Sequence, residues 1–375
     1  MKDFFIRDSR LVLPDRIQGD VNLVVRDGVI ADITADPSRC AGLPAVDGGG
    51  GFVAPSPVEV HFHGIGDYGF DQEDDAVVGK IARELSARGT ACFVPGFTYR
   101  EGMIGRCVRE IRRSRELQDR IPGILIEGPF VSMDKLGGIR PECVRKPDLD
   151  LLKRILDLCD GMLRMMTVAP ELEGIGPVID CLLENGVIPC LGHSDCTTGQ
   201  ALAAARRAPM SMTHLFNAMS SISHKDPGLA LLPFLHKDIY FELNADGVHV
   251  APEVLRVCYQ CLNRERMIII SDAVVSAGKA YGRYRYHGMG VVSDAHGVRY
   301  EDSNILIGSN LLVLDIAVNF AAVTGAALPE AMRMAALNPC RLLGLDGRRG
   351  SIAVGKKADL VLLDRDLHLA KSLVD

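Results

Sequence analysis

The middle of the chain alternates short apolar runs with longer amphipathic segments. Short apolar runs are typical of buried strands, and apolar positions three or four residues apart indicate helices. The pattern predicts eight strands, at residues 58–63, 91–97, 123–127, 163–168, 187–193, 211–214, 240–244 and 267–272. Helix-length patterns lie between most of them, at residues 74–88, 103–117, 149–159, 177–185, 198–207 and 252–263. This alternation predicts an α/β fold with a parallel sheet closed into a (β/α)8 TIM-like barrel.

Both ends of the chain carry short strand patterns with few helical ones. Apolar runs near the N-terminus are separated by turn signals such as Asp27-Gly28, and a similar run follows Gly355. We therefore expect a small β-sandwich domain built from residues 1–53 and 340–375, with the barrel at residues 54–339. Amphipathic segments 311–324 and 329–337 are expected to pack outside the barrel. The polar, glycine-punctuated segment 282–299 is expected to form a hairpin or loop over one barrel face.

Composition excludes several classes of partner. The formal net charge of −6 argues against nucleic acid, because phosphate neutralisation needs a basic surface. The sequence has no apolar run long enough to predict a membrane span, so we expect no membrane partner. Charged residues interrupt the first eight positions, so no signal peptide is predicted. The 11 scattered cysteines fit reduced thiols, and together these features predict a cytoplasmic protein.

The first predicted barrel strand carries two histidines on one face. Along Val58-Glu59-Val60-His61-Phe62-His63 the apolar positions alternate with the others, which is the period of a strand. His61 and His63 therefore point the same way, as two ligands of a transition metal would. A pair like this is equally typical of structural histidines, so the rest of the chain has to decide between the two interpretations.

Other strand ends carry the same kinds of residue. In a (β/α)8 barrel the C-terminal strand ends meet at one mouth, where the chemistry takes place. The residues at these ends are His61, His63, Glu127, His193, His214 and Asp272. Each histidine alone could be structural, and Asp272 alone could cap the next segment. Together they predict a hydrolytic centre, in which a divalent ion lowers the pKa of a bound water and Asp272 carries the proton.

Longer motifs resemble those of a known family. They are His61-Phe62-His63-Gly64, Ile126-Glu127-Gly128-Pro129-Phe130, Leu191-Gly192-His193-Ser194, Thr213-His214-Leu215-Phe216-Asn217-Ala218-Met219, Asp246-Gly247-Val248-His249 and Ser271-Asp272-Ala273. In this order they resemble the N-acetylglucosamine-6-phosphate deacetylases of the amidohydrolase superfamily, over nearly the whole chain. The resemblance implies a barrel of the metal-dependent hydrolase type. It also implies hydrolysis of the N-acetyl amide of an amino-sugar 6-phosphate, with release of acetate.

The resemblance also assigns roles to individual residues. Glu127, His193 and His214 would be the core metal ligands, and His61 with His63 would hold a second ion that Glu127 bridges. The expected cofactor is zinc, as one or two ions per subunit. Asp272 would act as general base and then acid, and His249 would bind the amide carbonyl or a sugar hydroxyl. The partners implied are an N-acetylated amino sugar phosphate and a second subunit in a homodimer. The substrate-binding residues would be Gly138, Ile139, Asn217, Ala218, Lys225, Asp246, Gly247, Val248, His249, Leu306, Ile307 and Gly308.

Two positions depart from the family pattern. Ile139 stands where the family has a substrate-contacting histidine, and Lys225 stands where it has a phosphate-binding arginine that often reaches across a dimer interface. Lysine meets a phosphate as a point charge, without the bidentate geometry of arginine. The alternative interpretation is that Lys225 is a solvated charge on a loop, with no role in binding. These changes leave the amide chemistry intact and the identity of the acyl sugar open.

Three alternatives follow. The first is a deacylase for another N-acyl sugar, such as N-acetylgalactosamine-6-phosphate or an unphosphorylated sugar, or for an N-acyl amino acid. The second is a cyclic amidase, which is disfavoured because Glu127 occupies the place where those enzymes use a carboxylated lysine. The third is a non-catalytic scaffold, which is disfavoured because the expected ligands and base are all present in the sequence.

Overall fold

The computed structural model describes residues 3–208 and 210–374. Its central sheet consists of parallel strands in the order β15-β14-β13-β12-β11-β8. The bounds are β8 (Val58–Phe62), β11 (Cys92–Thr98), β12 (Ile124–Glu127), β13 (Leu163–Val168), β14 (Ile188–Leu191) and β15 (Ser211–Met212). The five residues of β8 are all buried, as expected for a strand covered on both faces.

Two further parallel strands complete the predicted set of eight. They are β16 (Phe241–Leu243) and β17 (Met267–Ile269), which pair with each other. Backbone hydrogen bonds join this pair to the larger sheet at both edges. The Met212 N–H donates to the Tyr240 carbonyl at 2.9 Å, and the Asp272 N–H donates to the His61 carbonyl at 3.0 Å. The curled sheet is consistent with the predicted TIM-like barrel, although the strands do not pair as one closed sheet.

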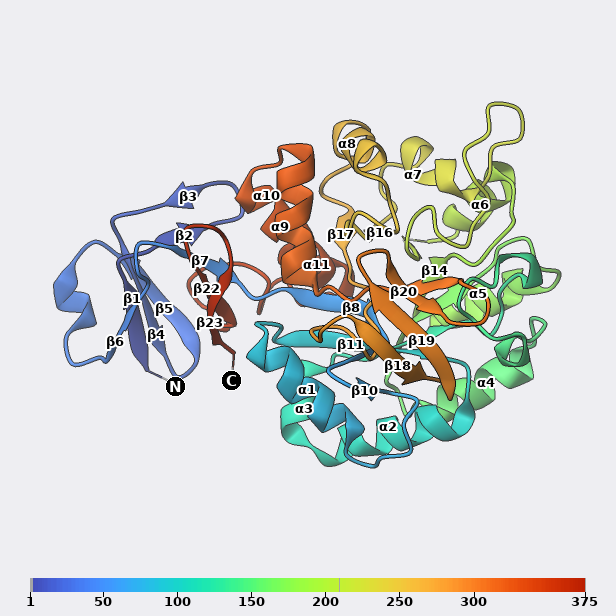
Figure 1. Ribbon diagram of the computed structural model, residues 1–375, viewed down its shortest axis with the longest axis horizontal. Helices are drawn as coiled ribbons and strands as arrows, with labels where there is room; N and C mark the ends of the chain where they lie inside the picture. The colour runs from blue at the N-terminus through green and yellow to red at the C-terminus, as the bar shows by residue number, and fades with distance from the viewer. Residues whose placement is uncertain (1–2, 209, 375) are drawn as a thin grey trace.

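Helices flank the curled sheet, as Figure 1 shows. Their bounds are α1 (Val77–Ala87), α2 (Glu101–Arg113), α3 (Arg115–Arg120), α4 (Leu149–Leu158), α5 (Ile175–Glu184), α6 (Thr198–Ala205), α7 (Leu232–Leu235), α8 (Pro252–Cys261), α9 (Val313–Thr324), α10 (Leu328–Met332) and α11 (Asn338–Leu343). Shorter turns are η1 (Pro37–Cys40), η2 (Met133–Lys135), η3 (Pro141–Cys143), η4 (Leu229–Leu231) and the π-helical η5 (Arg333–Leu337). The single helix predicted at 103–117 was wrong. Ser114 adopts an extended conformation and its side chain caps α3, so the segment divides in two.

Strands from both ends of the chain share a sheet beside the barrel (Figure 1). One sheet contains β1 (Phe4–Arg7), β4 (Asn22–Arg26), β5 (Val29–Thr34) and β6 (Ala45–Asp47). The other contains β2 (Arg10–Val12), β3 (Ile17–Gln18), β7 (Phe52–Pro55), β22 (Leu360–Leu363) and β23 (Leu369–Leu373). A separate apolar cluster that includes Ile6, Leu23 and Leu362 is buried with them. The domain boundaries stay a prediction, and residues 1, 2 and 375 lie outside the described residues.

The polar segment after β17 forms an antiparallel sheet in front of the barrel strands (Figure 1). It consists of β18 (Gly282–Tyr286), β19 (Met289–Asp294), β20 (Gly297–Tyr300) and β21 (Leu306–Gly308). A hairpin or loop was predicted here, and the structure shows a hairpin, β18–β19, extended by the two further strands β20 and β21. A short hairpin of β9 (Gly64–Ile65) and β10 (Tyr68–Gly69) follows the first barrel strand. Within the described ranges, none of the helices combines the length and hydropathy needed to cross a bilayer.

Candidate metal centre and active site

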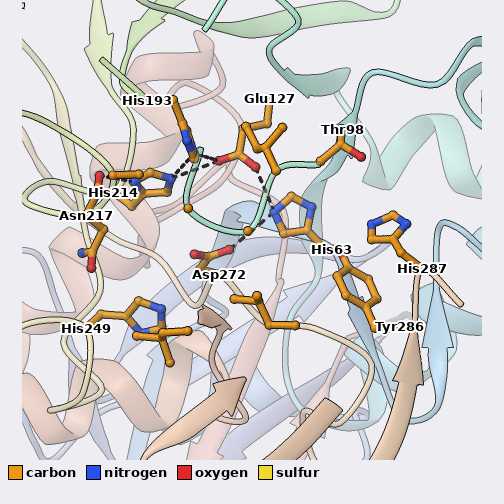
Figure 2. Close-up of a pocket in the computed structure, with 16 residues that line it drawn as sticks. His63, Thr98, Glu127, His193, His214, Asn217, His249, Asp272, Tyr286 and His287 are labelled. Carbon is orange, nitrogen blue, oxygen red and sulfur yellow. Dashed lines mark hydrogen bonds and ion pairs between the residues drawn. The ribbon is translucent and has the colours of Figure 1, made fainter. Parts of the chain in front are cut away.

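The predicted strand-end residues converge at one place in the structure. His61 lies in β8, His63 directly follows it, and Glu127 ends β12. The other three lie in the segments just after β14, β15 and β17, and are His193, His214 and Asp272. All six are buried. Figure 2 shows five of them pointing toward one another, with Glu127 and Asp272 between the imidazoles.

Glu127, His193 and His214 form the tighter of two groups. The Nε2 atoms of His193 and His214 lie 2.9 and 3.0 Å from Glu127 Oε1, and 3.0 Å from each other. Each Nδ1 lies against a backbone carbonyl, that of Lys135 at 2.8 Å and that of Asn217 at 3.1 Å. A carbonyl can only accept, so each Nδ1 carries the proton and, in the neutral ring, Nε2 presents a lone pair. Three lone-pair atoms this close repel one another unless a positive charge lies among them.

His61, His63 and Glu127 form a second, wider group. The Nε2 atom of His61 lies 3.5 Å from Glu127 Oε1, and that of His63 lies 3.6 Å from Glu127 Oε2. Their Nδ1 atoms are held by Glu242 Oε2 at 2.8 Å and by the Gly96 carbonyl at 3.1 Å. The buried Nε2 atom of His61 has no hydrogen-bond partner among the described residues. Glu127 belongs to both groups.

The electrostatics of the cluster favour positive charge. Burial by itself would raise the pKa of Glu127, but when the imidazoles are protonated, the charge of His193 and the hydrogen bonds from the rings hold that pKa well below its ordinary value. Burial would lower the pKa of His61, but the charges of Glu242 and Glu127 raise it well above its ordinary value. A proton and a metal cation compete for the same imidazole lone pair. Nitrogen and carboxylate donors in this arrangement fit a divalent transition-metal ion.

Asp272 lies on the opposite side of the cluster from Glu127. Its Oδ1 atom is 3.4 Å from His63 Nε2 and 4.0 Å from His61 Nε2. Burial alone would raise the pKa of Asp272, but the hydrogen bond with His63 and the nearby imidazole charges lower it. The surrounding imidazoles therefore favour the charged form of this carboxylate. Gly308 permits this arrangement, since a Cβ there would lie 2.5 Å from the Asp272 carbonyl oxygen.

The backbone is strained where three of these side chains leave their strands. His193, His214 and Asp272 have φ values of 47°, 22° and 50°, a region that residues other than glycine rarely occupy. Such conformations cost of order 1–3 kcal/mol each and cluster at functional sites. This backbone conformation points each side chain into the barrel mouth. An extended continuation of the strand would point it elsewhere.

The cluster opens into a cavity between the barrel and the added β-sheet. The predicted substrate residues in its wall are Gly138, Ile139, Asn217, Ala218, His249, Leu306 and Ile307. Its other lining residues, which the sequence did not single out, are Thr98, Gly137, Tyr286 and His287. Figure 2 places Asn217 and His249 on one side of Asp272, and Thr98, Tyr286 and His287 on the other. Thr98 could have been found, because it ends β11 as Glu127 ends β12.

Several predicted residues lie outside the cavity wall. They include His61, Gly247, Val248 and Gly308, which do not line it. Asp246 is not in the wall either, but it holds a residue that is, because its Oδ2 atom lies 2.7 Å from His249 Nδ1. Burial would lower the pKa of His249, but this hydrogen bond and the charge of Asp246 raise it.

The two positions that depart from the family pattern differ in their surroundings. Ile139 is buried in the cavity wall beside Val131 and Cys143, so that part of the wall is apolar. Lys225 lies on an exposed loop outside the cavity. Its backbone N–H donates to Ser223 Oγ at 3.3 Å, a contact within the loop itself. Lys225 is therefore not brought together with the other predicted substrate residues of the same chain.

Comparison with known proteins gives consistent matches along the chain. The N-acetylgalactosamine-6-phosphate deacetylase of Escherichia coli O157:H7 is 32% identical, over 97% of this chain and 96% of the relative. The N-acetylglucosamine-6-phosphate deacetylase of Bacillus subtilis is 27% identical, over 98% of this chain and 95% of the relative.

A solved structure and a family model agree with these sequence matches. The structure is a mutant N-acetyl-D-glucosamine-6-phosphate deacetylase from Mycobacterium smegmatis in complex with N-acetyl-D-glucosamine-6-phosphate. It is 27% identical, with a TM-score of 0.91 over 100% of this chain and 98% of that one. The model of the amidohydrolase family matches residues 52–374. This chain therefore belongs to the amidohydrolase family, whose members are metal-dependent.

Proposed function

We propose that the protein is a metal-dependent deacetylase that hydrolyses the N-acetyl amide of an amino-sugar 6-phosphate. The reaction is N-acetylglucosamine-6-phosphate plus water to glucosamine-6-phosphate plus acetate. The observation that carries the proposal is the convergence of Glu127, His193 and His214 with Asp272 at the base of one cavity. The relatives named as amino-sugar 6-phosphate deacetylases support the substrate class.

Glu127, His193 and His214 would hold one ion, and His61, His63 and Glu127 would hold a second. We propose zinc, because imidazole and carboxylate donors suit it. A bound divalent ion lowers the pKa of water from 15.7 to about 7 and polarises a carbonyl oxygen. The tautomers fixed by the backbone carbonyls keep the Nε2 atoms of three imidazoles available for this role.

The protein's own residues would move one proton during the reaction. Asp272 takes a proton from the attacking water as the new C–O bond forms at the amide carbon. It then returns that proton to the nitrogen as the C–N bond breaks, so the amine leaves neutral. His249, held by Asp246, donates a hydrogen bond to the amide carbonyl or to a sugar hydroxyl.

A second candidate substrate is N-acetylgalactosamine-6-phosphate. Two observations favour it: the relative at 32% identity carries that name, and Ile139 makes the wall apolar where the family has a histidine.

For the phosphate group of the substrate we propose Lys225, reaching the cavity of the second subunit in a homodimer, since it lies outside the cavity of its own chain. We also propose a cytoplasmic location. Acetate release from N-acetylated glucosamine and galactosamine, each with and without the 6-phosphate, tests the substrate assignments.

The direct test of the function is Asp272→Asn. This variant should keep the fold and the metal content but lose about 10²- to 10⁴-fold in kcat, the usual contribution of a general base. Acetate release and metal content are measured on the same preparation. Wild-type turnover in the variant would refute the mechanism, and a protein that holds no divalent ion would refute the metal centre.

A further inference from the structure

Glu242 is a buried carboxylate directly beneath the candidate metal centre. It is the middle residue of β16, and its side chain has no exposed surface. Its Oε2 atom accepts two hydrogen bonds, from His61 Nδ1 at 2.8 Å and from the His214 backbone N–H at 3.1 Å. Its Oε1 atom has no partner in the described part of the chain. Burying a carboxylate with an unpaired oxygen is costly, which indicates a purpose other than stability.

The contact with His61 decides which nitrogen of that ring is free. An ionised carboxylate oxygen can only accept, so Oε2 accepts from both the His214 N–H and His61, and His61 Nδ1 carries the proton. Glu242 therefore directs the Nε2 lone pair of His61 toward Glu127. The other three imidazoles are held by backbone carbonyls, at Gly96, Lys135 and Asn217. Among the four, His61 alone depends on a side chain.

The same oxygen also connects the two metal-binding groups. His214 belongs to the tighter group and His61 to the wider one, and Glu242 Oε2 contacts both. The His214 backbone has a φ of 22°, and the hydrogen bond from its N–H helps to hold that conformation. Partners that fix the tautomer of a ligating histidine commonly change metal affinity about 10- to 100-fold when removed.

We propose that Glu242 is a positioning residue that orients His61 and thereby gives the His61–His63–Glu127 group its affinity for an ion of its own. The inference rests on the metal centre proposed above. It goes further by assigning the occupancy of the second group to a residue that does not itself bind the ion. Glu242→Gln removes the charge at constant shape, and Glu242→Leu removes the acceptor altogether.

The experiment measures bound zinc, without reference to turnover. Wild type, Glu242→Gln, Glu242→Leu and the double variant His61→Ala/His63→Ala are dialysed against buffered zinc, and bound metal is counted. We expect two ions in wild type and one in the double variant. We expect the second ion to bind about 10- to 100-fold more weakly in at least the Leu variant. Thermal unfolding of each protein confirms that the variants are folded.

Glu59→Gln is the matched control. Glu59 is also buried and close to the same histidine, but its hydrogen bond is to the His61 backbone N–H, at 3.0 Å, and not to the ring. This variant should bind both ions like wild type. Equal weakening in the Glu59 and Glu242 variants, or wild-type affinity in both Glu242 variants, would overturn the inference. A wild-type protein with one ion that survives loss of His61 and His63 would overturn it too, while leaving the proposed deacetylase intact.

Discussion

The two candidate metal-binding groups share Glu127 but are built differently. In the Glu127–His193–His214 group the facing atoms lie 2.9–3.0 Å apart, and backbone carbonyls hold both imidazoles. In the His61–His63 group the distances to Glu127 are 3.5 and 3.6 Å, and Glu242 holds one ring. Backbone carbonyls are fixed by the fold, whereas a side-chain carboxylate can be changed without altering the chain path. The tighter group should therefore be the more robust site.

Changing the shared residue should have the largest effect. Glu127→Gln removes the charge that both groups use, so we expect both ions to bind poorly. Activity should fall about 10³-fold or more, because a catalytic ion supplies several kcal/mol. Acetate release and zinc content measure the effect. Glu110→Gln, a partly buried carboxylate on α2 that accepts from the Val78 and Gly79 N–H groups, is the control. Full zinc content in Glu127→Gln would argue against a bridging role.

Single histidine changes should separate the two groups. His193→Ala removes one of the three residues of the tight group and should cost about 10²-fold or more in kcat. His63→Ala should cost only about tenfold, or about 1.4 kcal/mol, because the tight group still holds its ion. Turnover is measured for both variants at saturating zinc. Equal losses would mean that the two groups act as a single unit.

The pH dependence of His249 tests an imidazole that lies outside both groups and is held by the carboxylate of Asp246. Asp246 raises the pKa of His249 against the effect of burial, so the ring keeps its charge to a higher pH than an ordinary histidine. Because of the raised pKa, the charged ring stabilises the fold at pH values below the ordinary histidine pKa. That stabilisation is lost as the pH rises through the pKa of His249 in the folded protein. Asp246→Asn should move the His249 titration, followed by nuclear magnetic resonance, to lower pH. An unmoved titration would show that Asp246 does not set the pKa.

Lys225→Ala should have the smallest effect. An exposed charge pair contributes up to about 1 kcal/mol, so KM for the phosphorylated sugar should rise about fivefold while kcat stays the same. The unphosphorylated sugar is the control substrate and should not change. If both substrates respond alike, Lys225 takes no part in phosphate binding.

Much of the fold, and the types of residue in the candidate site, could be predicted from the local pattern of the sequence. Period-two alternation located β8 and put His61 and His63 on one face, and strand ends led to Glu127, His193, His214 and Asp272. Where the pattern failed, the cause was local as well. A single serine cap at position 114 ended one helix and began another, although the apolar spacing continued through it.

Contacts between distant segments were decided only by the tertiary structure. His61 and Glu242 are 181 residues apart, and they meet because β8 and β16 lie on the same barrel. Tyr286 and His287 reach the cavity because β18 and β19 pack over the barrel mouth. Periodicity reports which face a side chain occupies on its own strand. It does not report what lies opposite that face, so the sequence determined the candidate ligands and the fold determined what orients them.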